Sequence, residues 1–167
     1  KKGAGIHIDV SKYFARGLHH AFARACPDLS LILLVRDPIL NMRSFLNRNK
    51  SFTLDNNMPE AKSNLLRLPC DGFEKGELYL WAWCEMYLRY LALIEKYNIE
   101  ISTVIHTSDL NDAYKMNAHF DTLQLLHTPV KMTKPRNTNV EQGKDQTVIT
   151  TEDIELFEKF ILRVPQP

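Results

Sequence analysis

The stretch Leu29-Ser30-Leu31-Ile32-Leu33-Leu34-Val35-Arg36-Asp37-Pro38 decides the fold. Residues 29–35 are apolar except for Ser30, and an apolar run of this length predicts a strand buried on both faces of a parallel sheet. Proline is favourable at a helix start, so a helix is predicted from Pro38 to about Asn47. A buried strand that passes through a charged pair into a helix is typical of α/β proteins.

Segments on both sides continue this alternation. Upstream, the alternating residues Ile6, Ile8 and Val10 predict a strand, and Ser11 is placed to cap a helix that ends near Cys26. Downstream, the pattern predicts helices over 77–97, near 108–110, over 119–127 and over 150–162, and a strand over 99–105. The 167 residues fit one domain. We therefore predict a single α/β domain over residues 1–167, a three-layer parallel sheet flanked by helices.

The predicted helix before the deciding strand has an apolar stripe. Phe14, Leu18, Phe22 and Cys26 recur at four-residue spacing, as on a helix face that packs against a core. Residues 49–75 are polar and contain prolines, so they predict a long loop of the kind that often shapes a substrate site.

Composition excludes several classes of protein. Hydrophobic residues make up 44% and charged residues 25%, which is typical of a globular chain. Lys and Arg number 21 against 20 Asp and Glu, so no general attraction to nucleic acid is expected. No apolar run is long enough for a membrane span, and no signal-peptide core follows the N-terminus. Three cysteines without CxxC spacing indicate buried reduced thiols in a cytoplasmic protein, with no disulfide framework or zinc site.

The end of the deciding strand carries the chemistry. Ligands of open parallel sheets bind at the carboxyl ends of the strands, where Arg36 lies. Ser44 follows eight residues later on the predicted helix. A guanidinium and a hydroxyl that converge there suit a phosphate, because guanidinium pairs bidentately with phosphate oxygens. The alternative interpretation is an Arg36 paired with Asp37 or another acid and a merely solvated Ser44.

This element resembles the 3′-phosphate motif of the sulfotransferases that use PAPS (3′-phosphoadenosine-5′-phosphosulfate). In that family the matching Arg and Ser hold the 3′-phosphate, so the resemblance implies that Arg36 and Ser44 bind PAPS and its product PAP. Further similar segments are residues 8–12 around Asp9 and Lys12, the helix with Trp81 and Trp83, residues 107–110 after a strand, and the basic loop 134–139 with Arg136. The resemblance implies a P-loop-like sulfotransferase fold, with Lys12 and Arg136 beside the nucleotide and no metal.

The acceptor must lose a proton as it attacks, so a base is expected. His7 and Asp9 share the polar face of the first predicted strand, and the family uses a histidine or a carboxylate in this role. Asp9 matches the carboxylate position better, whereas an imidazole at His7 titrates nearer neutral pH. A third possibility is a base in a segment that this sequence lacks. The family's P-loop-like first element has no counterpart here, so we expect the sequence to be N-terminally incomplete.

The leading hypothesis is transfer of a sulfuryl group from PAPS to a hydroxyl or amine of a glycan or small molecule. One alternative is a kinase-like P-loop phosphotransferase, although no Walker lysine is visible. Another is a non-catalytic nucleotide-binding domain of the same fold. The acceptor and the oligomeric state are not predicted.

Overall fold

A computed structural model describes residues 18–47, 64–125, 128–131 and 148–165. Along the chain these residues form α1 (Leu18–Ala25), β1 (Leu31–Val35), α2 (Pro38–Leu46), α4 (Lys75–Tyr97), β2 (Ser102–His106), the short 3₁₀ helix η3 (Asp109–Asn111), α5 (Ala113–Thr122) and α6 (Thr151–Ile161). Within the described ranges the chain is thus a mixed α/β protein, with five α-helices and a sheet of two parallel strands. The predicted α/β class is confirmed at this level.

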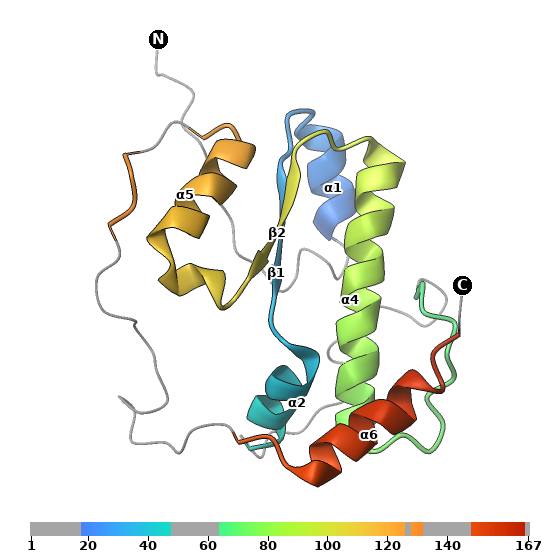
Figure 1. Cartoon of the computed structure of the whole chain (residues 1–167). Coiled ribbons are helices and arrows are strands. Elements are labelled where there is room, and N and C mark those ends of the chain that lie inside the picture. The colour runs from blue at the N-terminus through green and yellow to red at the C-terminus, as the bar shows by residue number, and fades with distance from the viewer. Residues whose placement is uncertain (1–17, 48–63, 126–127, 132–147, 166–167) are drawn as a thin grey trace.

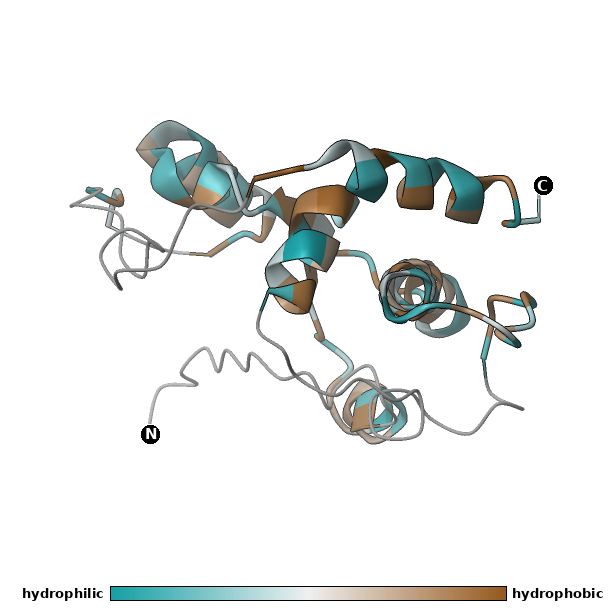
Figure 2. Cartoon of the chain, turned by 90° about the horizontal axis from the view of Figure 1, so that it is seen from below, coloured by the Kyte–Doolittle hydropathy of each residue, from teal (hydrophilic) through white to brown (hydrophobic). Residues whose placement is uncertain are grey.

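The two strands pair in parallel from Leu31 opposite Ser102 to Val35 opposite His106. Parallel neighbours need a crossover connection, and α2 and α4 lie within that connection. Helices α1 and α4 lie on one side of the sheet and α5 on the other (Figure 1). Seen from below, α6 and α1 lie on opposite sides of α4 (Figure 2), and α4 contacts α2, α6 and β1.

β1 is not buried on both faces, so that prediction is wrong for the structure described. Leu31 is buried and packs with Tyr90 and Leu93 of α4. On the opposite face Ile32 is 40% exposed and Leu34 is 52% exposed. The reason is that α5 contacts β2 on that side, and no comparable contact joins it to β1.

The prediction that the apolar stripe of the first helix packs against a core is also wrong for the described residues of that stripe. Leu18 is 48% and Phe22 36% exposed, and Cys26 is exposed as well. The buried side chain of α1 is instead His19. Helix α1 turns its histidine side toward α4, where His20 Nδ1 lies 2.6 Å from the Tyr97 hydroxyl. Phe14 lies outside the described residues.

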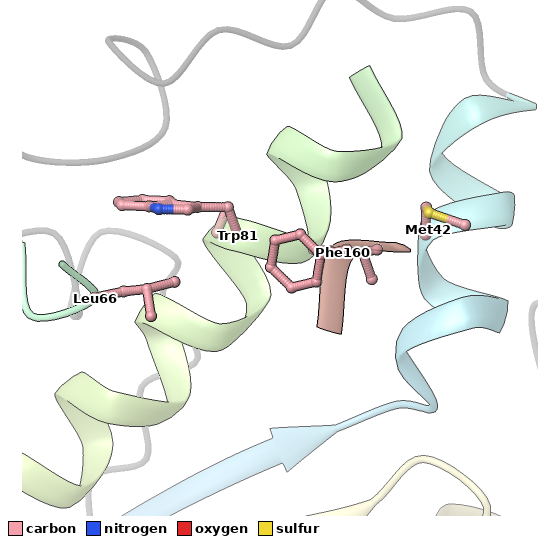
Figure 3. Packing of buried hydrophobic residues seen from close by; sticks show 6 residues of the cluster. Met42, Leu66, Trp81 and Phe160 are labelled. Carbon is pink, nitrogen blue, oxygen red and sulfur yellow. The ribbon is translucent and has the colours of Figure 1, made fainter. Parts of the chain in front are cut away.

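The main core joins α2, α4 and α6. Met42, Trp81 and Phe160 are each at most 2% exposed and belong to one cluster with Leu66. Figure 3 shows the Phe160 ring between Trp81 on α4 and Met42 on α2. The helices approach closely at Gly76, where a Cβ atom would lie 3.1 Å from Met42 Sδ.

Helices α2 and α6 begin close to the residues that the sequence predicts, and each begins with a capping residue. Asp37 caps α2, since its Oδ1 accepts a hydrogen bond from the Leu40 amide at 2.8 Å. Thr150 and Asp153 form a capping box at the start of α6. Asp153 also lies 3.6 Å from Arg43 on α2, which ties the two helices together.

A buried carboxylate fastens the segment before α4 to that helix. Glu85 is 0% exposed and accepts hydrogen bonds from the amides of Leu65 (2.9 Å) and Leu66 (2.7 Å). It also pairs with Arg89 Nε at 2.6 Å, and Arg89 in turn donates to Asn64 at 2.9 Å. Residues 64–74 contain no helix or strand, in agreement with the predicted loop. The remainder of that loop, residues 49–63, lies outside the described residues.

Among the helices that the structure describes, none has the length and apolar content needed to cross a membrane.

Candidate functional site

The carboxyl ends of β1 and β2 meet at one edge of the sheet. Val35 pairs with His106, and the Thr107 amide donates a hydrogen bond to the Val35 carbonyl at 2.7 Å. Arg36 is therefore the first residue beyond β1, and it lies beside the chain that leaves β2. This is the place where open parallel sheets bind ligands.

Arg36 places a positive charge at this edge of the sheet. Its half-buried side chain makes no hydrogen bond or ion pair with any residue in the described part of the chain. The Asp37 carboxylate caps α2 and forms no ion pair with Arg36. The backbone at Arg36 is fixed instead by Trp83, whose Nε1 donates to the Arg36 carbonyl at 3.3 Å. The interpretation of Arg36 as one half of an Arg36–Asp37 pair is thus wrong.

Ser44 lies two turns further along α2. It is only 8% exposed, so it is not the solvated serine of the alternative interpretation. Its hydroxyl has no hydrogen-bond partner among the described residues, and no hydrogen bond joins it to Arg36. Ser44 lies seven positions after the cap, a rise of roughly 10 Å along the helix. Arg36 and Ser44 therefore lie on one element without contacting each other, and both keep their hydrogen-bonding capacity for a ligand.

A second polar cluster surrounds Asp109, immediately after β2. Asp109 is 7% exposed, and its carboxylate lies 2.8 Å from Lys115 Nζ and 3.5 Å from His119 Nε2. It also accepts a hydrogen bond from the His106 amide at 3.3 Å. His119 Nδ1 in turn lies 3.2 Å from the Thr103 hydroxyl. This cluster fastens α5 to β2 and fixes the loop beside Arg36.

The charges within the cluster shift the pKa values of Asp109 and Lys115. The hydrogen bond from Lys115 is the main reason why the pKa of Asp109 lies below its usual value, and the His106 amide lowers it further. The same hydrogen bond raises the pKa of Lys115. Both groups therefore stay charged over a wider pH range than they would in the unfolded chain.

Sequence reasoning missed this cluster as a unit. For residues 107–110 the sequence indicated only a resemblance to a family segment and a helix start. One signal could have found it. Lys115 and His119 are four residues apart, so they share one face of a helix that begins just after an acidic residue at a strand end.

We expect Asp109→Asn to lower stability at neutral pH and to have little effect in acid. A carboxylate with a depressed pKa stabilises the fold above its unfolded value of about 3.8, and this contribution is lost as the pH falls through the folded value. Urea unfolding at pH 7 and pH 2.5 measures the difference. Asp28→Asn, at an exposed position after α1, is the matched control. A destabilisation of equal size at both pH values would show that the charge of Asp109 is not responsible.

The remaining predicted site residues cannot be placed. His7, Asp9, Lys12 and Arg136 lie outside the described residues. Among the aromatic residues of α4, Trp81 is buried, whereas Trp83 is half-buried and stacks with the exposed Tyr87 at a centroid distance of 6.1 Å.

The cysteines are free, as predicted, but Cys26 is exposed and the other two are only half-buried. Burial raises the pKa of the Cys84 thiol to about 11, so this thiol stays protonated at neutral pH. In the described ranges no three His, Cys, Asp or Glu side chains come together as a metal site would require.

No family model, curated protein or solved structure matches this chain.

Proposed function

We propose that this chain is the major part of a PAPS-dependent sulfotransferase domain with the P-loop-like fold of that family, and that the edge at Arg36 binds the 3′-phosphate of the nucleotide. A cytoplasmic location and a glycan or small-molecule acceptor are part of the proposal. The observation that supports it is that two groups on one strand–helix element, the Arg36 guanidinium and the Ser44 hydroxyl, form no hydrogen bond with any described residue.

These two groups suit a terminal phosphate. A guanidinium presents two parallel N–H donors to two phosphate oxygens, and a hydroxyl can donate to a third. The Asp37 carboxylate accepts the cap hydrogen bond of α2 and forms no ion pair with Arg36. The hydrogen bond from Trp83 to the Arg36 carbonyl limits the backbone freedom that binding would otherwise remove.

The chemistry makes modest demands on the protein. The acceptor oxygen or nitrogen attacks the sulfur of PAPS, the bond from sulfur to the 5′-phosphate oxygen breaks, and PAP leaves. As in phosphoryl transfer, positioning and the stabilisation of spread negative charge do most of the work. In this proposal Arg36 and Ser44 position the nucleotide, Lys12 and Arg136 add positive charge, and Asp9 or His7 takes the acceptor proton.

We expect PAP to stabilise the protein against heat, and 5′-AMP, which lacks the 3′-phosphate, to do so much less. Each hydrogen bond to a charged group contributes ~1.5–3 kcal/mol. The loss of one such bond corresponds to roughly tenfold to 150-fold, so Arg36→Ala, which removes two donors, should weaken PAP binding by at least that factor. Ser44→Ala removes one hydroxyl and should weaken binding less. Thermal shift gives the first comparison, and calorimetric titration gives the dissociation constants.

Arg67→Ala is the matched control, because Arg67 is an exposed arginine in the segment before α4. It should leave PAP affinity unchanged. Equal stabilisation by ATP and PAP would favour a kinase-like function instead. If PAP does not bind, or if Arg36→Ala binds it as well as the wild type does, the proposal is wrong. Binding of PAP without sulfuryl transfer would indicate a non-catalytic nucleotide-binding domain.

A further inference from the structure

A hydroxyl, an imidazole and a carboxylate form a continuous chain beside β2. Thr103 Oγ1 lies 3.2 Å from Nδ1 of His119, and Nε2 of the same ring lies 3.5 Å from Asp109 Oδ2. Thr103 lies within β2, Asp109 follows that strand, and His119 lies on α5. This order of groups, and not any sequence spacing, activates hydroxyl nucleophiles in hydrolases of unrelated folds.

The partners of Asp109 fix the tautomer of His119. An ionised carboxylate only accepts hydrogen bonds, so the Nε2 that faces Asp109 carries the proton of the neutral ring. Nδ1 is then an acceptor, and the Thr103 hydroxyl donates to it. Lys115 Nζ, at 2.8 Å, bonds to Oδ1 of Asp109, and Oδ2 is left to His119 and to the His106 amide. His119 is therefore oriented as a base toward Thr103.

The face of the sheet beside Thr103 is apolar and open. Thr103 is opposite Ile32 in the strand pairing and Ile105 is opposite Leu34, so these four side chains share one face. Ile32 is 40% and Leu34 52% exposed, and Thr103 is half-buried. This surface suits an apolar acyl chain whose carbonyl carbon lies at the Thr103 hydroxyl.

A backbone amide next to Thr103 is not used in the pairing of β2 with β1. The Thr107 amide, just beyond β2, donates to β1, so alternate residues back to Thr103 turn their backbone groups toward that strand. The Val104 amide therefore points to the other edge, along which no further strand is paired within the described ranges. The His106 amide points the same way and donates to Asp109. Val104 thus supplies a donor for an oxygen that becomes negative as the hydroxyl attacks.

We propose that Thr103, His119 and Asp109 form an acyl-transfer site for carboxylic esters with an apolar acyl chain. The Thr103 oxygen bonds to the ester carbonyl carbon as its proton moves to His119 Nδ1. His119 gives that proton to the departing alcohol oxygen as the ester C–O bond breaks, which leaves the acyl group on Thr103. Water, deprotonated by the same ring, then hydrolyses the acyl-threonine to the free acid and restores the hydroxyl. This proposal does not depend on the nucleotide site at Arg36.

An alkyl fluorophosphonate probe and p-nitrophenyl esters test the site on the full chain. The phosphonate should add to a single residue, and peptide mass spectrometry should locate the adduct at Thr103. The protein should hydrolyse p-nitrophenyl butyrate faster than the acetate, because the longer chain covers more of the apolar face. Leu34→Asn, at an exposed position, should reduce that preference. The absence of an adduct at Thr103 would overturn the proposal.

Four variants identify the groups responsible. Thr103→Val fills the same space without the hydroxyl, so labelling and hydrolysis should both be lost, whereas Thr103→Ser keeps the hydroxyl and should retain both. His119→Gln removes the base and should lower the rate of hydrolysis by roughly 100-fold or more. Thr122→Val is the matched control, because Thr122 is exposed on α5 and its hydroxyl donates to the Ala118 carbonyl at 3.0 Å. It should behave as the wild type does. Hydrolysis that persists unchanged in Thr103→Val would refute the site.

Discussion

Glu85→Ala is expected to lower the free energy of unfolding by about 3–5 kcal/mol, because it removes one member of a buried ion pair. Arg89 is 7% exposed and loses the carboxylate at 2.6 Å. The amides of Leu65 and Leu66 lose their acceptor in the same step. Most domains have a total stability of roughly 5–15 kcal/mol, so this single change approaches the limit that the fold can tolerate. Urea denaturation followed by circular dichroism measures it.

Two further variants sharpen the test of Glu85. Glu95→Ala lies on the same helix at an exposed position and should change stability by no more than ~0.5 kcal/mol. The double variant Glu85→Ala/Arg89→Ala should be less destabilised than the sum of the two single variants, because the uncompensated charge is then absent. A loss below about 1 kcal/mol for Glu85→Ala would mean that water reaches Arg89 and that the network is not buried in solution.

Phe160→Ala should have a comparable effect, about 3–5 kcal/mol, for a different reason. The ring is 1% exposed and fills the space between α2 and α4, so its removal leaves a cavity that three helices cannot easily close. It also contacts Phe73 edge to face at 6.1 Å, which joins the segment before α4 to the same cluster. We therefore expect α6 to separate from the core more readily than any other helix in this variant.

The neighbouring Ile161 provides the control for Phe160. It is 39% exposed on the same helix, so Ile161→Ala should cost far less. Thermal unfolding of the two variants under one set of conditions gives the comparison, and limited proteolysis shows whether α6 is cut first. Similar melting temperatures for both variants would indicate that Phe160 is not buried in a packed core.

Local signals were sufficient to predict most of the described helices and strands. The apolar run at residues 31–35, the proline at the start of α2, and the Thr150–Asp153 capping pair each specify their element through neighbours in the sequence. Prediction failed where the deciding partner is distant. The apolar stripe of α1 pointed to the wrong face, because the histidine side of that helix is bonded to Tyr97, 77 positions away.

The error at β1 has the same cause, whereas the error at α5 came from a local signal that was missed. Helix α5 begins earlier than predicted, since Asp112 accepts hydrogen bonds from the amides of Tyr114 and Lys115 and so starts the helix at Ala113. An apolar sequence alone could not show that Leu34 would be exposed, because that depends on where α5 packs.

The candidate site was predictable only in part. Arg36 and Ser44 could be proposed as site residues because ligands bind at the strand ends of parallel sheets. That neither side chain bonds to another described residue depends on tertiary packing, which the sequence does not show. The Asp109 cluster joins residues from β2, η3 and α5, and its distances depend on how those elements pack.

The parallel pairing of β1 with β2 has a consequence for the order of folding. Val35 and His106 are neighbours in the sheet, yet the whole of α2 and α4 lies between them in the sequence. Closing so long a loop costs entropy before any strand hydrogen bond forms, whereas helices gain their contacts locally and quickly. The edge that holds Arg36 is therefore assembled late. During synthesis, a nascent chain that ends after α4 already contains Arg36 and Ser44, but it has no second strand to complete the site around them.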